Sequence, residues 1–381
     1  MTDIWNTDER VSLRAMVRDF TEKEIAPKLA DWERDGLVPR ELHRKAGELG
    51  LLELGFPEAA GGAGDLIDFL VTVEELIGNG GSMGLCGALH SHTIGAPHIA
   101  AAGDPDQIAR FVKPALAGEK ICGLAVTEPG GGSDVASLRT KAVREGDHYV
   151  VNGSKTYITS GLRADFITTA VRTGDDPHRG VSLLVIEKGT PGFEVSRKLD
   201  KLGCHCSDTA ELAFTDVRVP AANLVGQEGS GFVQIMQRFD SERLTMAVQG
   251  VAMAQRSLDL AIDWARNRIT FGQPLAQRQV IRHKFAEMAR QVTAARIFVH
   301  HVAEQYVAGE RVSTEVAMAK NTAVAAADHT INQALQIFGG MGYMRESEVE
   351  MHFRDGRLLG IGGGATEVMN ELISRSLGLD G

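Results

Sequence analysis

The chain has 381 residues, 43% of them apolar, which is enough to bury a large core in one large unit or in two to three domains. Its 50 acidic residues outnumber 40 basic ones, and no basic block or basic stripe with aromatics is present, so nucleic acid is not an expected partner. The first residues lack the basic and apolar regions of a targeting signal, and no window holds the roughly 18 apolar residues of a membrane span. We therefore expect a soluble cytoplasmic protein.

From Thr7 to about residue 120, apolar side chains such as Leu13, Val17 and Phe20 recur at three- and four-residue spacing, which is typical of helices. Prolines and paired glycines interrupt the pattern, so several helices are expected. The pattern predicts an all-helical amino-terminal domain over residues 1–122.

Residues 123–228 change to the period of strands and are predicted to form a β domain that resembles a barrel or a sandwich. The pair Asn152-Gly153 lies between two runs rich in β-branched and aromatic residues, which is the strongest short signal for a hairpin turn. Residues 181–186 and 210–214 are expected to be further strands.

The helical period returns after Gly231 and holds through long segments rich in Ala, Met and Leu, notably 232–267, 278–307 and 313–337. Helices of this length bury their apolar faces most readily in a four-helix bundle. Residues 229–381 are therefore predicted to form such a bundle, which makes the chain an α+β protein of three domains.

The four cysteines, Cys86, Cys122, Cys204 and Cys206, are too few for a disulfide framework and fit a reducing compartment. Cys204-His205-Cys206 could be half of a metal site. No second Cys/His pair stands at zinc-like spacing, so no metal is expected.

Two glycine-rich segments could approach a phosphate group closely. In 125–134 the run Gly130-Gly131-Gly132 could turn successive N–H groups toward a diphosphate, or it could be a plain surface loop. Segment 360–365 fits the dinucleotide pattern G-x-G-x-x-A loosely. Too few residues follow it to form a βαβ unit, so a Rossmann site is rejected.

Five motifs together resemble the acyl-CoA dehydrogenase family over essentially the whole chain, in the same order and with the same spacing. They are Val126-Thr127-Glu128-Pro129 through Gly132-Ser133-Asp134, Tyr157-Ile158-Thr159, Arg268-Ile269-Thr270-Phe271-Gly272, residues 336–343 (QIFGGMGY) and Arg354-Asp355. The resemblance implies the three-domain fold of that family and an FAD cofactor held without a Rossmann fold.

By this resemblance, two sets of residues would hold the FAD. The isoalloxazine and pyrophosphate would meet Leu124, Val126, Thr127, Gly132, Ser133, Tyr157, Ile158 and Thr159. The adenosine half of the FAD of a neighbouring subunit would meet Arg268, Thr270, Phe271, Gln279, Gln336, Gly339 and Gly340. A homo-oligomer is therefore implied, which we expect to be a tetramer built as a dimer of dimers.

The reaction that the resemblance implies is α,β-dehydrogenation of an acyl-CoA thioester to the trans-2-enoyl-CoA, as in fatty-acid β-oxidation. A base takes the α proton while the β hydrogen leaves as hydride to flavin N5. Hydrogen bonds to the thioester carbonyl acidify the α proton, and exclusion of solvent strengthens a carboxylate base. The electrons would pass to an electron-transferring flavoprotein.

The base is expected at an unusual position, because Gly363 stands at the loop position where most members carry their catalytic glutamate. The chain resembles instead the long-chain and isovaleryl-CoA dehydrogenase branch, in which the base lies on the first long helix of the carboxy-terminal domain. Glu242 matches that position, with Phe239 at i−3 and Met246 at i+4 as apolar neighbours. Gly363 would leave space for its carboxylate. The alternative is a solvated Glu242 paired with Lys or Arg.

Ser133, Asp240 and Arg243 are carried over as contacts to the substrate, while Arg243 could instead form an ion pair with Asp240 or Glu242. Small residues at Gly84, Gly87 and Ala88 could widen the acyl pocket or could serve close helix packing.

Two other functions remain open from the sequence. One is an acyl-CoA oxidase on the same fold, because oxygen access depends on packing around the flavin. The other is a non-catalytic flavin-binding subunit of a mixed oligomer, which the missing loop base favours and Glu242 opposes.

Overall fold

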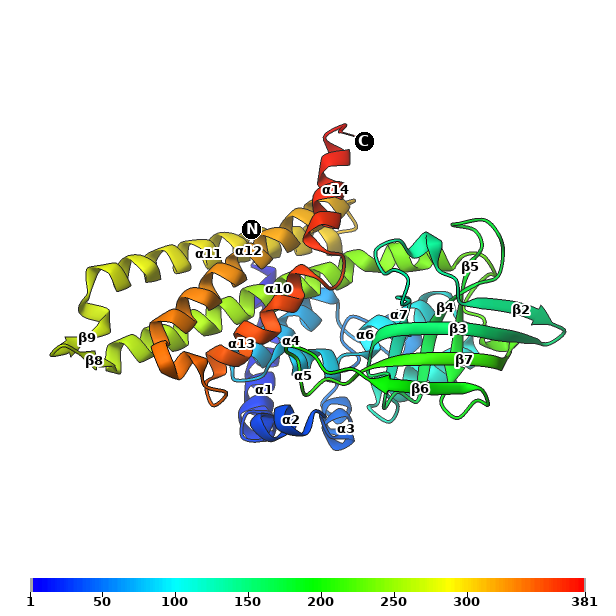
Figure 1. Cartoon of the computed structure of the whole chain (residues 1–381), viewed down its shortest axis with the longest axis horizontal. Helices are drawn as coiled ribbons and strands as arrows, with labels where there is room; N and C mark the ends of the chain where they lie inside the picture. Colours follow the sequence, from blue (N-terminus) through cyan, green and yellow to red (C-terminus); the bar gives the residue numbers. More distant parts are fainter. Residues whose placement is uncertain (1–2, 380–381) are drawn as a thin grey trace.

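The computed structural model describes residues 3–379 and divides along the chain into helices, a sheet and helices again (Figure 1). The α+β architecture predicted from the change of period is confirmed. The first helical part carries α1 to α9, whose bounds are Asp8–Phe20, Leu29–Asp35, Arg40–Glu48, Leu66–Gly78, Met83–Leu89, His92–Gly95, Pro97–Ala102, Pro105–Gln107 and Lys113–Leu116.

The middle part is one curled seven-stranded sheet. Its strands β1 to β7 are Cys122–Ala125, Lys141–Glu145, His148–Thr159, Phe166–Arg172, Val181–Glu187, Phe193–Lys198 and Thr209–Pro220. The strand order is β1-β4-β2-β3-β7-β6, with β5 paired to β4. β4 runs parallel to both β1 and β2, whereas the other strand pairs are antiparallel. Apolar side chains on its inner face, such as Tyr149, Leu184 and Phe214, form a core of their own.

The predicted hairpin turn at Asn152-Gly153 is wrong, because β3 runs unbroken through both residues. The turn lies earlier, where Glu145 of β2 pairs with His148 and Gly146 has a φ of +62°. At Asn152-Gly153 the register with β7 shifts instead, which marks an irregularity in the strand. A Cβ on Gly153 would lie 2.7 Å from Thr140 Cα, so the glycine permits a close approach of backbones.

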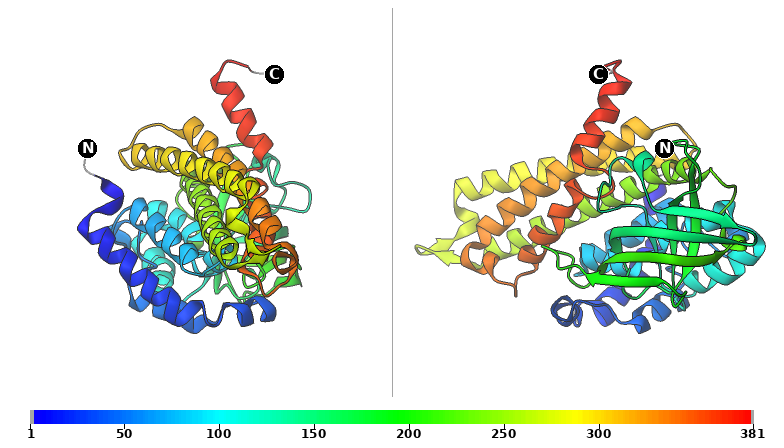
Figure 2. Two further views of the ribbon diagram at one scale, coloured as in Figure 1. Left: turned by 90° about the vertical axis from the view of Figure 1, so that its left-hand side faces the viewer. Right: turned by 45° about the vertical axis from the view of Figure 1, so that its right-hand side comes forward.

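The carboxy-terminal part contains three long helices and two shorter ones. They are α10 (Gly231–Asn267), α11 (Gln279–Val307), α12 (Ser313–Phe338), α13 (Glu348–Gly356) and α14 (Thr366–Ser376). The hairpin of β8 (Ile269–Thr270) and β9 (Gln273–Pro274) lies at the end of the bundle far from the sheet, and α14 stands out from its side (Figure 2). No helix within residues 3–379 is both long and apolar enough to cross a bilayer.

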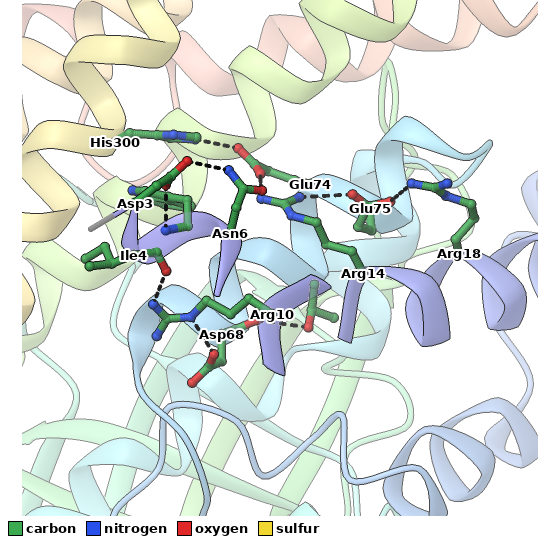
Figure 3. A network of polar contacts seen from close by, with 12 residues as sticks. Asp3, Ile4, Asn6, Arg10, Arg14, Arg18, Asp68, Glu74, Glu75 and His300 are labelled. Carbon is green, nitrogen blue, oxygen red and sulfur yellow. Dashed lines mark hydrogen bonds and ion pairs between the residues drawn. The ribbon is translucent and has the colours of Figure 1, made fainter. Parts of the chain in front are cut away.

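A polar network connects α1 with α4 and with α11 of the carboxy-terminal bundle (Figure 3). Arg14 of α1 pairs with Glu74 and Glu75 of α4 at 3.0 and 2.9 Å. Glu74 also pairs with His300 of α11 at 2.7 Å, and the His300 ring stacks on Trp5. The amino-terminal helices and the bundle are thus joined by hydrogen bonds, between Glu74 and His300 and from Trp5 to Glu304, as well as by a large shared apolar core.

Candidate active site

The ends of β1 and β3 meet and bring together the residues predicted to hold the flavin ring. The Thr156 N–H donates to the Thr127 carbonyl at 2.9 Å, and a Cβ on Gly123 would lie 2.8 Å from the Thr159 carbonyl oxygen. The segment from Leu124 to Thr127 therefore lies beside Tyr157-Ile158-Thr159, as expected if both segments contact one flavin.

Glu128 holds the glycine-rich loop in place. Its carboxylate accepts the Arg139 and Thr140 N–H groups at 2.7 and 2.8 Å and the Lys155 ammonium at 2.8 Å. Burial lowers the pKa of Lys155 to about 8, although Glu128 opposes that shift. The loop backbone then turns at Gly131, whose N–H donates to the Glu128 carbonyl.

The exposed groups at this loop fit a flavin. Tyr157 is 69% exposed although aromatic, and its φ of +59° is a conformation that non-glycine residues rarely adopt. Side chains on Gly130 and Gly131 would meet nothing within 4 Å, so the loop has room for a ligand. Ile158 differs from its neighbours, because its side chain is buried in the sheet core and leaves only its backbone for a ligand.

The residues predicted to bind adenosine lie together at the other end of the bundle (Figure 1). Trp264 stacks on Phe338 with ring centroids 4.8 Å apart, which joins the end of α10 to the end of α12. Phe271, at the tip of the hairpin, is 98% exposed. The exposed predicted residues around this cluster are Arg268, Phe271, Gln279, Gln336, Gly339 and Gly340, and Thr270 is partly exposed.

One turn of α10 carries the three residues predicted to act on the substrate. Asp240 accepts from Arg243 Nη1 at 3.2 Å and from the Ser313 hydroxyl at the start of α12. Arg243 is buried and lies over the Phe239 ring, and its Nε has no hydrogen-bond partner among the described residues 3–379. The ion pair with Asp240, one of the two alternatives for Arg243, is present.

Glu242 has no hydrogen-bond partner within residues 3–379, although its side chain is only partly exposed. Burial raises its pKa to about 7, and the neighbouring Arg243 partly offsets that effect. A free carboxylate near neutrality is suited to accept a proton at physiological pH.

The expectation of empty space at Gly363 is wrong, because Met246 fills it. A Cβ on Gly363 would lie 2.4 Å from Met246 Sδ, and the residue has a φ of +59°. Met246 follows Glu242 by one turn of α10. The loop therefore packs on the helix next to Glu242 instead of leaving a vacancy.

The sequence analysis missed a residue that shapes this loop, Lys320 of α12. Its ammonium donates to the carbonyl of Gly362 at 2.6 Å and also to that of Gly364. The sequence does carry a signal, since Lys320 is the one charged residue among the apolar Val316, Ala317, Ala323 and Val324 at helical spacing.

Of the small residues of α5, Gly84 serves close packing. A Cβ on Gly84 would lie 2.8 Å from Cys204 Cα, and one on Gly87 would meet the Ser207 side chain. The segment Cys204-His205-Cys206 thus forms a loop between β6 and β7 that packs against α5. Asp355 of α13 accepts the Cys204 and Gly84 N–H groups at 2.6 and 3.3 Å, which joins all three parts of the chain.

Comparison with known proteins identifies the family. Three family models match in succession: the amino-terminal domain of acyl-CoA dehydrogenases at residues 7–119, the middle domain at 123–217 and the carboxy-terminal domain at 229–378. The chain belongs to the acyl-CoA dehydrogenase family. Members of this family are FAD-dependent oxidoreductases, so the cofactor and the class of enzyme predicted from the motifs are confirmed.

Individual relatives agree over nearly the full length. A crystal structure of a probable acyl-CoA dehydrogenase from Mycobacterium abscessus is 62% identical, covers 98% of this chain and 100% of its own, and has a TM-score of 0.97. An acyl-CoA dehydrogenase of Bacillus subtilis is 38% identical over 97% of this chain and 98% of its own. The mitochondrial long-chain specific acyl-CoA dehydrogenase of Rattus norvegicus is 37% identical over 97% and 87%.

Proposed function

We propose that the protein dehydrogenates an acyl-CoA thioester between its α and β carbons and that Glu242 takes the α proton. The observation that carries the proposal is the state of Glu242: a carboxylate without a hydrogen-bond partner in residues 3–379, held near neutral pKa by burial beside Arg243. A non-catalytic subunit would have no reason to keep an unpaired carboxylate in this position, because such a group destabilises the fold.

The protein groups prepare the proton transfer. FAD, when bound, supplies the acceptor for the hydrogen that leaves the β carbon. Glu242 receives the α proton on a carboxylate oxygen to which no donor in the described part of the chain is hydrogen-bonded. Arg243, fixed by Asp240, keeps part of the carboxylate population ionised at neutral pH. The packing of the loop at Gly363 on Met246 limits water beside the base, so the carboxylate remains strongly basic.

Ser133, Asp240 and Arg243 are proposed substrate contacts. Ser133 is exposed on the glycine-rich loop, and Val126 of that loop packs on the same apolar cluster as Phe239 of α10. Because the buried Nε of Arg243 has no hydrogen-bond partner in residues 3–379, we propose that it donates to an acceptor on the substrate.

The proposed active form is a homo-oligomer, expected to be a dimer of dimers, in which FAD crosses a subunit boundary. The support is the separation of the two candidate FAD regions at opposite ends of the molecule, at β1 and β3 and at the β8–β9 hairpin (Figures 1 and 2). In the proposed oligomer, each FAD therefore contacts the β1 and β3 region of one subunit and the β8–β9 hairpin region of another. The domain limits 1–122, 123–228 and 229–381 and a cytoplasmic location stay predictions.

The test is anaerobic mixing of the purified FAD-containing protein with acyl-CoA thioesters of different chain length. Bleaching of the flavin absorbance together with formation of the trans-2-enoyl-CoA is expected, and reoxidation by an electron-transferring flavoprotein should follow. Rapid peroxide formation in air would identify an oxidase instead. Failure of every acyl-CoA to bleach the flavin would contradict dehydrogenation.

A further inference from the structure

Lys320 is a buried cation that no carboxylate in residues 3–379 pairs with. Its side chain is 1% exposed, and its ammonium makes hydrogen bonds to the backbone carbonyls of Gly362 and Gly364. Burial lowers its pKa to about 8, and Arg243 acts in the same direction. A buried lysine without a carboxylate partner lowers the stability of the fold, so its presence indicates a role other than stabilisation.

These two hydrogen bonds fix the shape of the loop. Gly363 and Gly364 have φ values of +59° and +92°, so the chain turns and directs the carbonyls on either side of Gly363 toward one ammonium group. A loop of three successive glycines has no side chains of its own to hold this conformation. Lys320 therefore replaces the packing that larger residues would provide.

The fixed loop covers the face of α10 that carries Glu242. A Cβ on Gly363 would lie 2.4 Å from Met246 Sδ and would force the Met246 side chain to move, and a Cβ on Gly362 would meet Met246 Cε at 3.5 Å. Met246 stands one turn after Glu242 and therefore on the same face of the helix. On the other side, a Cβ on Gly364 would lie 3.9 Å from Arg243 Nε, next to the residue that moderates the charge of Glu242.

We propose that Lys320 is a positioning residue for the dehydrogenation. It holds the glycine loop, residues 362–364, over the face of α10 that carries Glu242 and so keeps water away from the base. This inference rests on the proposed function of Glu242. The charged groups around the pair are Arg243, which acts on both Glu242 and Lys320, and Asp240, which pairs with Arg243. Lys320 acts through the backbone of the loop and not through its own charge.

The variant Lys320→Met keeps an unbranched side chain, shorter by one atom, and removes the hydrogen-bond donors of the ammonium group. We expect the loop to move away from α10 and water to reach Glu242. The apparent pKa of Glu242, seen in the pH dependence of the flavin-reduction rate, should then fall by about one unit or more. A weaker base also lowers the maximal rate of flavin reduction by roughly three- to tenfold, while the KM for acyl-CoA and the FAD content change little. The measurement is anaerobic single-turnover flavin reduction by saturating acyl-CoA across pH 5 to 9 with the holoenzyme.

Asn321→Leu is the matched control. Asn321 is the next residue of α12 and donates to the Thr366 carbonyl and the Asn370 side chain of α14, so its loss loosens α14 without touching the glycine loop. Its pH profile should equal that of the unmodified enzyme. If Lys320→Met does not yield folded holoenzyme, Lys320→Gln, which retains one amide donor, is measured and should shift the profile in the same direction.

The outcomes separate this inference from the function it rests on. An unchanged apparent pKa in Lys320→Met, with only lower thermal stability, would mean that the lysine is merely structural. An apparent pKa that rises would mean that it acts by its charge, which also overturns the inference. If Glu242→Gln reduces the flavin at the unmodified rate, the proposed function itself fails, whatever the lysine variant does.

Discussion

Glu242 and Asp355 are two carboxylates of the carboxy-terminal helices, and desolvation by the surrounding protein raises the pKa of each to about 7. Their surroundings differ. Asp355 is fully buried and accepts two backbone N–H groups where the three parts of the chain meet, with nearby Glu33 raising its pKa further. Glu242 is partly accessible and has no partner within residues 3–379. A raised pKa thus occurs at a structural joint as well as at a proposed base, and it is the free, reachable oxygen that distinguishes the base.

The largest expected effect is on catalysis at Glu242. Glu242→Gln preserves shape and hydrogen bonding but removes basicity, so the rate of flavin reduction by acyl-CoA should fall by about 10² to 10⁴. Anaerobic stopped-flow absorbance measures this rate, and the flavin spectrum of the variant verifies that FAD stays bound.

The next effect is on stability at Asp355. Asp355→Ala leaves the Cys204 and Gly84 N–H groups buried without acceptors, and we expect a loss of roughly 2 to 5 kcal/mol in the free energy of unfolding. Asp355→Asn retains one acceptor oxygen and should lose less. Denaturant unfolding of the holoenzyme measures the stability of both variants. An Asp355→Ala variant as stable as the unmodified enzyme would show that Asp355 does not stabilise the contact between the three parts of the chain.

A smaller effect of opposite sign is expected for stability at Glu242. Since its pKa in the folded protein lies above the ordinary value of 4.5, the folded state holds the extra proton between pH 4.5 and 7, and stability falls as pH rises through this window. Glu242→Gln should therefore stabilise the protein by about 1 to 3 kcal/mol at pH 8 and hardly at all at pH 4. A variant that is less stable at pH 8 would show that the carboxylate is favourably solvated.

The smallest effect concerns moving the base to the loop. In the Glu242→Gln background, Gly363→Glu alone should restore almost nothing, because Met246 Sδ occupies the place of its Cβ and the backbone there is left-handed. Adding Met246→Ala removes the steric obstacle and should raise the rate of flavin reduction by about tenfold, with the backbone strain still present. Equal rates for the two variants would show that Met246 does not decide where a base can stand.

The sequence predicted the order of the three parts and the long helices well, because periodicity over 25 residues or more averages out local ambiguity. Predictions from the sequence failed at glycines, because a glycine can serve a turn, an open space or a close packing contact. The Asn152-Gly153 pair predicts a turn, whereas Gly153 instead permits close contact with Thr140, the residue just before β2. The missing side chain of Gly363 predicts empty space, although the sequence cannot reveal that Met246 lies against this glycine. The roles of Lys320 and Asp355 depend on contacts with residues 42 to 271 positions away, which no local pattern records.

The pH dependence of single-turnover flavin reduction in the unmodified enzyme, Glu242→Gln and Asp355→Asn tests most directly which carboxylate is the base. The account predicts that the rate of the unmodified enzyme rises with pH through an apparent pKa near 7, as Glu242 loses its proton. Asp355→Asn should keep this dependence, whereas Glu242→Gln should be slow and independent of pH in this range. A pH dependence that survives in Glu242→Gln but disappears in Asp355→Asn would contradict the assignment of Glu242 as the base.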